Sequence, residues 1–259
     1  MRIVIAGGTG TAGRAVVQQA MGRGHEAVAL SRSAPAPADL ISGNGLAEAL
    51  TGADVVIDCS NSNTQSRAKA ERFFVTATKN LVHAAAEAGV RRYLLLSIVG
   101  LENVPMGYYQ AKLAQEAALI ATATEAQLGY TIARATQFHD FAGQLLDRMR
   151  VGGLALIPRM RIQPVEVGEV AGRLLDCAEA EPVVRAPDLG GPQEEDLLAM
   201  ARQWVAHTGR RSRVVAVPLP GRAGRAVQAG GLLLTDGEAR GRTFAAWLAD
   251  QPGPDSGGS

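Results

Sequence analysis

A tyrosine and a lysine lie four residues apart in the stretch GYYQAKLAQE, at Tyr108 and Lys112. Side chains at this spacing share one face of an α-helix. A free tyrosine has a pKa of about 10, and a nearby ammonium favours the phenolate, which brings that pKa closer to working pH. Such a pair could act as a general acid or base. It is also typical of the polar first turn of an ordinary helix, and Tyr109 would be the acid if the helix began one residue later.

The elements around this pair alternate between strand and helix. Apolar runs predict strands, some with their exit loops, at 2–6, 26–32, 53–62, 91–100 and 130–140. Helices are expected between them, at 15–24, 45–52, 71–90 and 108–127. This alternation predicts a Rossmann-type α/β fold, a doubly wound parallel sheet with helices on both faces.

The pattern loosens beyond residue 150. Short strands are expected at 154–158, 161–167 and 214–220, and helices at 169–180, 196–209 and 244–250. We predict a Rossmann domain over 1–150, a small mixed C-terminal substrate lobe over 151–250, part of which returns to the main sheet, and a disordered tail over 251–259.

A glycine-rich turn, GGTGTAGR, joins the first strand to the first helix. Gly7 would permit the tight turn, Gly10 would let the backbone approach a pyrophosphate, and Gly13 would let the helix pack close to the sheet. The free N–H groups at a helix start bind phosphate. This context predicts NAD(P) binding by the whole turn, which comprises Gly7, Thr9, Gly10, Thr11, Ala12, Gly13 and Arg14.

The residue at the end of the second strand selects between the two dinucleotides. An acid there would bind the ribose 2′-hydroxyl of NAD, but this chain has Arg32, whose guanidinium suits a 2′-phosphate. NADP(H) is therefore favoured over NAD(H). Ser60 and Asn61 leave the third strand where the adenosine ribose or the pyrophosphate should pass.

These motifs resemble the short-chain dehydrogenase/reductase superfamily, in its extended and atypical branches that include NmrA-like NAD(P)-binding proteins. GGTGTAG, DVVID, TATKNLVHAAAEAGV, YLLLSIVG and YYQAK are similar to the family's motifs in the family's order, over residues 1 to about 180. The resemblance implies that Tyr108 is the proton donor, that Lys112 lowers the tyrosine pKa and holds the nicotinamide ribose, and that Ser97 binds the substrate carbonyl. It also implies that Asp39 and Leu40 meet the adenine, and that Asn80 bonds backbone near the sheet.

Three features depart from the family pattern. Ser97 and Tyr108 are closer in sequence than in most extended members. The asparagine that some members use as a proton relay should fall near Phe74, which cannot relay protons. Ala135 and Thr136 replace the usual Pro-Gly after the fifth strand.

The exit of the fifth strand supplies candidate pocket residues. Phe138, His139 and Phe141 could line a substrate pocket there, and His139 could be a second acid or an ordinary buried histidine. Arginines make the C-terminal lobe locally basic. They could bind an acidic substrate, but a solvated face is the favoured interpretation.

Composition narrows the class of protein. A formal charge of +1 and 4% aromatic residues argue against a nucleic-acid partner. No run is long and apolar enough to span a bilayer, and Cys59 and Cys177 have no metal-ligand spacing, so we expect a cytoplasmic protein with reduced thiols, no metal and no membrane contact. The expected partner is a small-molecule substrate, with monomer or homodimer left open.

We therefore expect an NADPH-dependent oxidoreductase that reduces a carbonyl or quinone-like small molecule with Tyr108, Lys112 and Ser97. Reduction of a quinone by direct hydride transfer would need no tyrosine acid. An epimerase or dehydratase with retained cofactor would use the same residues. A redox sensor of the NmrA-like kind would bind NADP(H) and regulate a partner without catalysis.

Overall fold

The chain divides into two compact units. The structure is a computed structural model that describes residues 1–253 apart from 33–36, 63 and 65. Unit 1 comprises Met1–Ile98, Met106–Arg134 and Val167–Pro187. Unit 2 comprises Val99–Pro105, Ala135–Glu166 and the described part of Asp188–Ser259. Each unit is described by itself.

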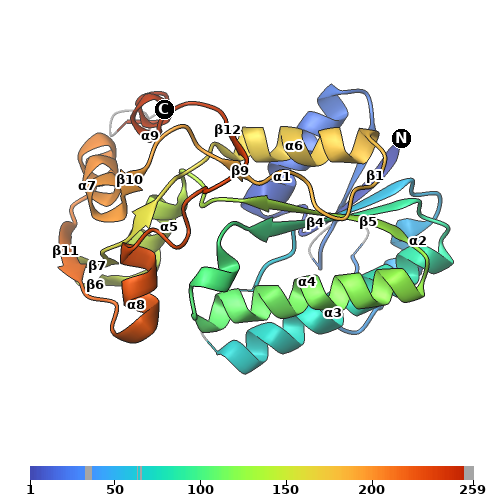
Figure 1. Cartoon of the computed structure of the whole chain (residues 1–259). Coiled ribbons are helices and arrows are strands. Elements are labelled where there is room, and N and C mark those ends of the chain that lie inside the picture. The colour runs from blue at the N-terminus through green and yellow to red at the C-terminus, as the bar shows by residue number, and fades with distance from the viewer. Residues whose placement is uncertain (33–36, 63, 65, 254–259) are drawn as a thin grey trace. The chain divides into compact units, whose positions relative to one another are not determined.

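A parallel sheet forms the centre of unit 1 (Figure 1). Its strands, in spatial order, are β5 (Gly129–Ala135), β4 (Arg92–Ile98), β3 (Val55–Asp58), β1 (Arg2–Ala6) and β2 (Glu26–Leu30). Nearly every residue of β1 and β3 is buried, because helices cover both faces of the sheet, and this explains their uninterrupted apolar sequences. Beyond β5 the sheet continues through β9 (Leu189–Gly190) and β12 (Glu238–Ala239), where Leu189 pairs with Ala135 inside unit 2.

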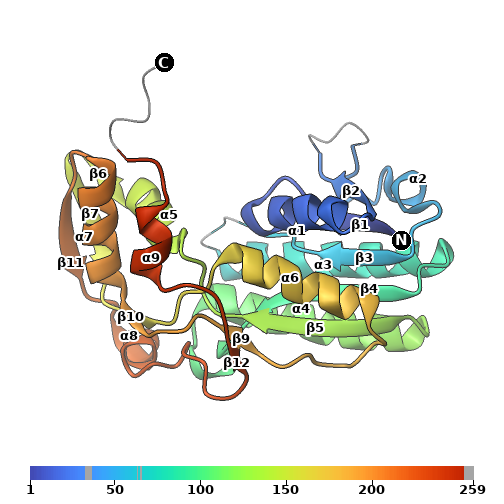
Figure 2. The same ribbon diagram turned by 90° about the horizontal axis from the view of Figure 1, so that it is seen from above.

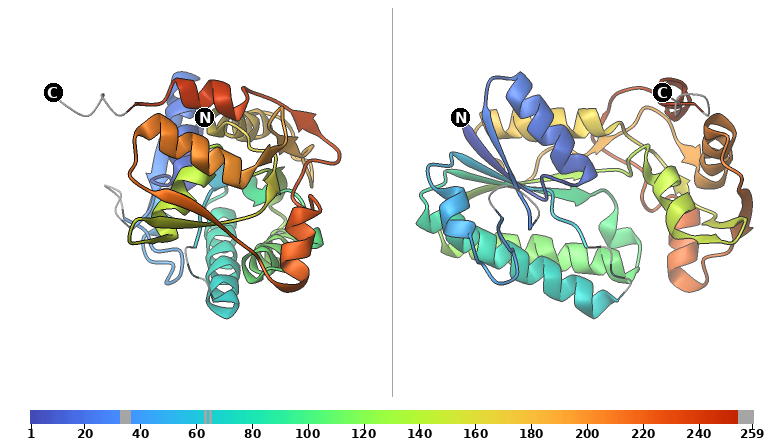
Figure 3. Two further views of the ribbon diagram at one scale, coloured as in Figure 1. Left: turned by 90° about the vertical axis from the view of Figure 1, so that its left-hand side faces the viewer. Right: turned by 180° about the vertical axis from the view of Figure 1, so that it is seen from behind.

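Two layers of helices flank this sheet, as Figures 1 and 3 show. On one face α3 (Arg67–Glu87) and α4 (Gly107–Glu125) lie side by side, with the short α2 (Leu46–Leu50) against α3. On the other face lie α1 (Thr11–Gly22) and α6 (Val167–Glu179). The order of strands and helices confirms the predicted Rossmann-type fold.

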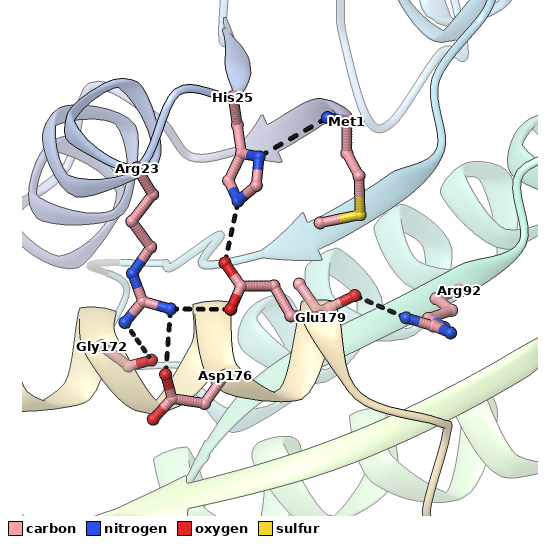
Figure 4. A network of polar contacts seen from close by, with 8 residues as sticks. Met1, Arg23, His25, Arg92, Gly172, Asp176 and Glu179 are labelled. Atoms are coloured by element: carbon pink, nitrogen blue, oxygen red, sulfur yellow. Dashed lines mark hydrogen bonds and ion pairs between the residues drawn. The ribbon is translucent and has the colours of Figure 1, made fainter.

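Helix α6 follows a unit 2 segment in the chain but packs on α1 in unit 1 (Figure 4). Arg23, just after α1, donates to Asp176 over 2.9 Å and to Glu179 over 3.2 Å. His25 lies 2.9 Å from the other oxygen of Glu179. On the sheet side, Arg92 donates to the backbone oxygen of Ala178 over 2.7 Å. These contacts fix the C-terminal half of α6 to the side of the sheet where β1 and β2 begin.

Unit 2 is a mixed assembly of short elements, visible in Figure 2. Its three-stranded sheet has the order β11 (Arg213–Val217), β7 (Leu154–Pro158) and β6 (Arg150–Val151), and β8 (Arg161–Ile162) pairs with β10 (Glu195–Asp196). Its helices are η1 (Leu101–Asn103), α5 (Phe141–Arg148), α7 (Leu197–Thr208), α8 (Gly221–Gln228) and α9 (Phe244–Ala249). An aromatic cluster of Trp204, Phe244, Trp247 and His139 forms part of its interior.

Unit 2 differs from the sequence expectations in several short elements. The strand expected over 161–167 spans only Arg161–Ile162, since Pro164 cannot donate to a ladder. Helices η1, α5 and α8 and the two-residue strands β6, β9, β10 and β12 were not expected. Of the tail predicted to be disordered, residues 254–259 lie outside the described residues. Among the described helices, none combines the length and the apolar character needed to cross a bilayer.

Candidate active site

The three motif glycines of the β1–α1 turn have distinct structural roles. Gly7 has φ +71°, and a Cβ there would lie 2.8 Å from the backbone oxygen of Cys59. A Cβ on Gly13 would lie 2.2 Å from the Gly7 oxygen, so only glycine lets α1 approach the turn this closely. At Gly10 a Cβ would meet only the Gly7 oxygen, at 3.3 Å, and otherwise open space. The fold itself therefore requires Gly7 and Gly13, whereas the small residue at Gly10 fits the approach of another molecule.

The start of α1 has no side chain that neutralises its positive end. Gly10 is the N-cap, no side chain caps the helix, and its first turn holds no acidic residue. Thr9 and Arg14 are exposed, and Arg14 donates to the Thr9 oxygen over 2.7 Å. Such a helix start attracts anions, since its N–H groups and its dipole face outward. The turn fits the pyrophosphate of a dinucleotide.

Residues that we expect to contact the adenosine part of the cofactor lie in the loop after β2. Arg32 is exposed, and its positive charge contributes to lowering the pKa of the Asp39 carboxyl. The largest cause of that lowered pKa is a hydrogen bond from the backbone N–H of Ser42 to the Asp39 carboxylate. The backbone N–H of Ile41 donates to the same carboxylate oxygen, and both bonds measure 2.8 Å. The Asp39 carboxylate is thus engaged by its own loop. Asn80 of α3 donates to the Leu40 and Ile41 oxygens, the backbone-binding role that the resemblance implied.

Tyr108 lies in the first turn of α4, which begins at Gly107. Its ring is half-buried and packs edge-on against Phe74, with 5.9 Å between the ring centres. Its hydroxyl donates to Oδ1 of Asn61 over 2.9 Å. A residue expected to bind cofactor and the expected acid are therefore in direct contact at the edge of the sheet where the strands end.

Tyr109 is in a different environment from Tyr108. It is 7% exposed, and burial raises its pKa well above the usual range. A buried phenol of this kind holds its proton and has little access to a substrate. The structure thus separates the two candidate acids, with Tyr108 the accessible one.

Lys112 is buried, with an exposed fraction of 3%. Its ammonium donates to the Leu96 oxygen over 3.0 Å and to Oε1 of Gln115 over 2.6 Å. It also lies 4.9 Å from the centre of the Phe74 ring, a cation–π contact. Burial lowers the pKa of Lys112 to about 8, although the charges of Asp58 and Glu116 oppose this effect. Lys112 and Tyr108 therefore contact the same aromatic ring.

A buried polar network below Lys112 was not identified from the sequence. Asp58, at the end of β3, is 1% exposed and accepts from the hydroxyl of Tyr93 over 2.8 Å. Gln115 donates to the same carboxylate oxygen over 3.2 Å and to the hydroxyl of Thr78 over 3.1 Å. The aspartate in the otherwise apolar run VVID was the available signal, because a buried carboxylate needs partners.

Two serines beside this network have buried hydroxyls without a partner. Among the described residues, Ser60 and Ser97 each have a side-chain oxygen with no hydrogen bond. Asp58 pairs with Leu95 in the ladder between β3 and β4. Ser60 lies two residues after Asp58, and Ser97 lies two residues after Leu95. An orphaned hydroxyl costs free energy unless something binds it. These two groups fit polar atoms of a cofactor or a substrate.

The expected pocket residues Phe138, His139 and Phe141 lie in unit 2. His139 is 1% exposed, lies 5.2 Å from Trp247 between ring centres, and its Nε2 is 3.1 Å from the Arg242 oxygen. Burial lowers the pKa of His139. The structure therefore places His139 in an aromatic interior, whereas Phe141, the first residue of α5, and Phe138, three residues before it, are half-buried. A pocket formed by these residues stays a prediction.

Comparison with known proteins agrees with this picture of a dinucleotide site. A family model described as NAD(P)H-binding matches residues 7–177. Photosystem II assembly factor Ycf39 of Synechocystis sp. is 32% identical over 117 residues, which cover 40% of this chain and 36% of that protein. Divinyl chlorophyllide a 8-vinyl-reductase of Cucumis sativus is 24% identical over 220 residues, 73% of this chain and 52% of that protein. The matches thus span between a third and just over half of each relative's length.

A solved structure extends the likeness to nearly the whole chain. It is a short-chain dehydrogenase/reductase superfamily protein from Agrobacterium tumefaciens with bound NAD, and it superposes with a TM-score of 0.70 at 19% sequence identity. The match covers 96% of this chain and 95% of that one. At this identity the match establishes the fold.

Proposed function

We propose, given that this chain belongs to the NAD(P)H-binding family, that it is an NADPH-dependent oxidoreductase that reduces a carbonyl or quinone-like small molecule. Membership confirms the resemblance to the short-chain dehydrogenase/reductase superfamily that the motifs indicated. The observation that carries the proposal is the pairing of Tyr108 and Lys112 on one ring, Phe74, with the Tyr108 hydroxyl bonded to Asn61.

The cofactor would be held by groups that the fold leaves open. Gly10 and the start of α1 would bind the pyrophosphate, and Arg32 would bind the 2′-phosphate that distinguishes NADP from NAD. Ser60 and Asn61 would contact the ribose or the pyrophosphate. When bound, the nicotinamide supplies the hydride for reduction.

The side chains of α4 and β4 would supply the proton and orient the substrate. Tyr108 is accessible, and its hydroxyl already donates a hydrogen bond, so it would give its proton to the oxygen of a carbonyl that replaces Asn61 as acceptor. Ser97 would donate its unpartnered hydroxyl to the same oxygen. Lys112 would place a positive charge near the phenol as it loses its proton.

The decisive experiment compares two tyrosine variants. Tyr108→Phe should lower the turnover number for carbonyl substrates by about 100-fold or more, the usual contribution of a general acid. The matched control Tyr109→Phe removes a buried hydroxyl from the adjacent residue and should keep the turnover number within about threefold of the wild type. NADPH oxidation would be followed with a panel of ketones, aldehydes and quinones, and NADPH affinity would be measured in parallel.

The outcome also separates the alternative chemistries. Unchanged carbonyl turnover in Tyr108→Phe would refute the proposed acid. If Tyr108→Phe lost carbonyl turnover but kept quinone turnover, the quinone would be reduced by direct hydride transfer, which needs no tyrosine. An epimerase or dehydratase that retains its cofactor would show no net oxidation of NADPH in any of these assays.

A redox sensor is a second candidate, and Phe74 is the observation that favours it. Its ring is fully buried against Tyr108 and Lys112, at the position where the family resemblance would place a proton-relaying asparagine. A sensor should bind NADPH and NADP+ with different affinities and should turn over no substrate. Equal affinities for both forms, measured by calorimetry, would count against this candidate.

A further inference from the structure

A continuous chain of buried polar groups connects β3 to α4 in unit 1. Asp58 and Gln115 are 1% and 0% exposed, and Lys112 is 3% exposed. From Asp58, the chain passes through the carboxamide of Gln115 and ends at the ammonium of Lys112. Polar groups are buried at a cost in free energy, so a satisfied chain of this length needs an explanation.

The chemistry of the three side chains fixes how Gln115 must be oriented. A lysine ammonium can only donate, and a carboxylate can only accept. The carboxamide is one of the few groups that offers an acceptor to the first and a donor to the second. Accordingly Oε1 accepts from Lys112 over 2.6 Å, and Nε2 donates to Asp58 over 3.2 Å. Reversing the amide would lose both bonds.

Further contacts hold this chain in place from the neighbouring elements. Tyr93 of β4 donates to the Asp58 carboxylate, and the backbone N–H of Ser60 donates to its other oxygen over 2.9 Å. Thr78 of α3 accepts the second hydrogen bond of the Gln115 amide. Burial, together with the Asp58 charge, raises the pKa of Tyr93, so that its hydroxyl keeps the proton that it donates.

The apolar side of Lys112 is closed by Phe74 of α3, over whose ring the ammonium lies. This side therefore offers the ammonium a cation–π contact. Among the described residues, the other titratable groups that act on Lys112 are Glu116 of the same helix and Cys59, which directly follows β3. Glu116 is itself bound by Arg134 in a two-point ion pair, and burial raises the pKa of Cys59 above the usual range, which keeps that thiol neutral. Asp58 is thus the carboxylate that reaches the ammonium through a single intervening side chain.

We propose that Asp58 and Gln115 are positioning residues for Lys112, in which Gln115 fixes the ammonium beside Phe74 and Asp58 supplies the charge that keeps it protonated. This inference rests on the proposed function only where it concerns turnover, because the placement and the charge of Lys112 can be measured directly. Neither residue is expected to touch substrate or cofactor.

The test titrates Lys112 by NMR. The chain has three lysines, Lys69, Lys79 and Lys112, so ¹³C-lysine labelling gives a simple spectrum, and the signal missing in Lys112→Met assigns Lys112. Lys69 and Lys79 are exposed on α3 and serve as internal references, and far-UV circular dichroism would show that the variants are folded. The titration would be run on the wild type, Asp58→Asn, Gln115→Met and the control Asp54→Asn, which alters a carboxyl group just before β3 that is bonded to Arg91.

The wild-type Lys112 signal should titrate near pH 8. Asp58→Asn and Gln115→Met should each move that midpoint down by about one pH unit, because the charge or its link to the ammonium is lost, and Asp54→Asn should leave it in place. If the protein is a reductase, the basic limb of its kcat profile should move by the same amount, whereas a merely structural defect would lower kcat at every pH.

The proposal is overturned if the Lys112 midpoint stays fixed in both Asp58→Asn and Gln115→Met. If Asp58→Asn does not fold, Gln115→Met decides alone, because it removes the link to Lys112 and leaves the bond between Tyr93 and Asp58 intact. The Lys112 midpoint could move in the variants while neither the wild type nor any variant reduces a substrate. That result would support the positioning role and count against the reductase, so the two proposals fail separately.

Discussion

The backbone of Gly7 lies so close to Gly13 that a Cβ on Gly13 would stand 2.2 Å from the Gly7 oxygen. That contact brings α1 against the turn after β1. Gly10 lies between these two glycines but has open space on the side where a Cβ would point, apart from the Gly7 oxygen. The two positions therefore predict different kinds of failure on substitution.

Gly13→Ala should destabilise the fold, and Gly10→Ala should impair binding. We expect Gly13→Ala to lower the free energy of unfolding by about 3 kcal/mol, because the added carbon meets rigid backbone. Gly10→Ala should change it by about 1 kcal/mol or less, yet weaken NADPH binding roughly tenfold or more. Urea denaturation and fluorescence titration with NADPH measure the two effects. A Gly10→Ala protein that binds normally would contradict the dinucleotide role of this turn.

The core of unit 1 and the glycine-rich turn after β1 could be predicted from sequence because their signals are local. Apolar runs such as Arg2–Ala6 are buried on both faces, and the glycines follow the strand directly. The sequence predicted that Tyr108 and Asn61 lie at the same edge of the sheet, but it did not predict their hydrogen bond, which depends on where α4 places Tyr108 relative to the loop after β3.

The buried network below Lys112 could not be predicted in the same way. Gln115 has the sequence signature of a surface helix residue, and its role comes from the packing of α3 on α4, which covers it completely. Several elements of unit 2 are too short for periodicity to reveal. Strand β9 has two residues, and the eight-residue α8 contains two glycines, which weaken any helical signal.

Arg32 should determine the proposed preference for NADP(H). Arg32→Ala removes an exposed guanidinium after β2, so we expect NADPH affinity to fall about tenfold, the loss of one charge-assisted hydrogen bond, while NADH affinity stays the same. Arg91→Ala is the matched control, since it removes another exposed arginine that bonds Asp54. Equal losses for both dinucleotides, measured by calorimetry, would assign Arg32 a role other than phosphate selection.

Glu116 and Arg134 form an ion pair in the interior of unit 1. The guanidinium donates to both carboxylate oxygens, over 2.8 Å and 2.6 Å, and the side chains are 9% and 4% exposed. Glu116→Gln leaves a buried positive charge without its partner, so we expect a loss of about 3 kcal/mol or more in the free energy of unfolding.

The control for this prediction is an exposed pair on α3. Glu71→Gln breaks the contact with Arg67, whose side chain is 62% exposed, and should cost less than about 1 kcal/mol. The double variant Glu116→Met with Arg134→Met should recover most of the lost stability, because no unpaired charge remains. Equal losses in Glu116→Gln and Glu71→Gln, measured by urea denaturation, would show that burial does not strengthen the inner pair.

Lys112 should make the free energy of unfolding increase with pH. The buried groups with raised pKa values should make it decrease. An unfolded lysine keeps its proton up to a pKa of 10.5, whereas folded Lys112 releases it at about 8. Between these values unfolding takes up a proton, so the contribution of Lys112 to the free energy of unfolding rises with pH. Below pH 8 Lys112 is protonated, so the folded protein buries a positive charge. The desolvation cost of that charge is then at its largest.

Comparison with Lys112→Met isolates this contribution, because Cys59, Tyr93 and Tyr109, whose pKa values are raised, titrate in both proteins. The difference in free energy of unfolding, wild type minus variant, should increase by roughly 2 kcal/mol between about pH 7.5 and about pH 9.5. Urea denaturation at several pH values measures it. A difference that stays constant over this range would mean that Lys112 keeps its proton throughout, and a decrease would mean that the buried ammonium is stabilised more strongly than its desolvation penalises it.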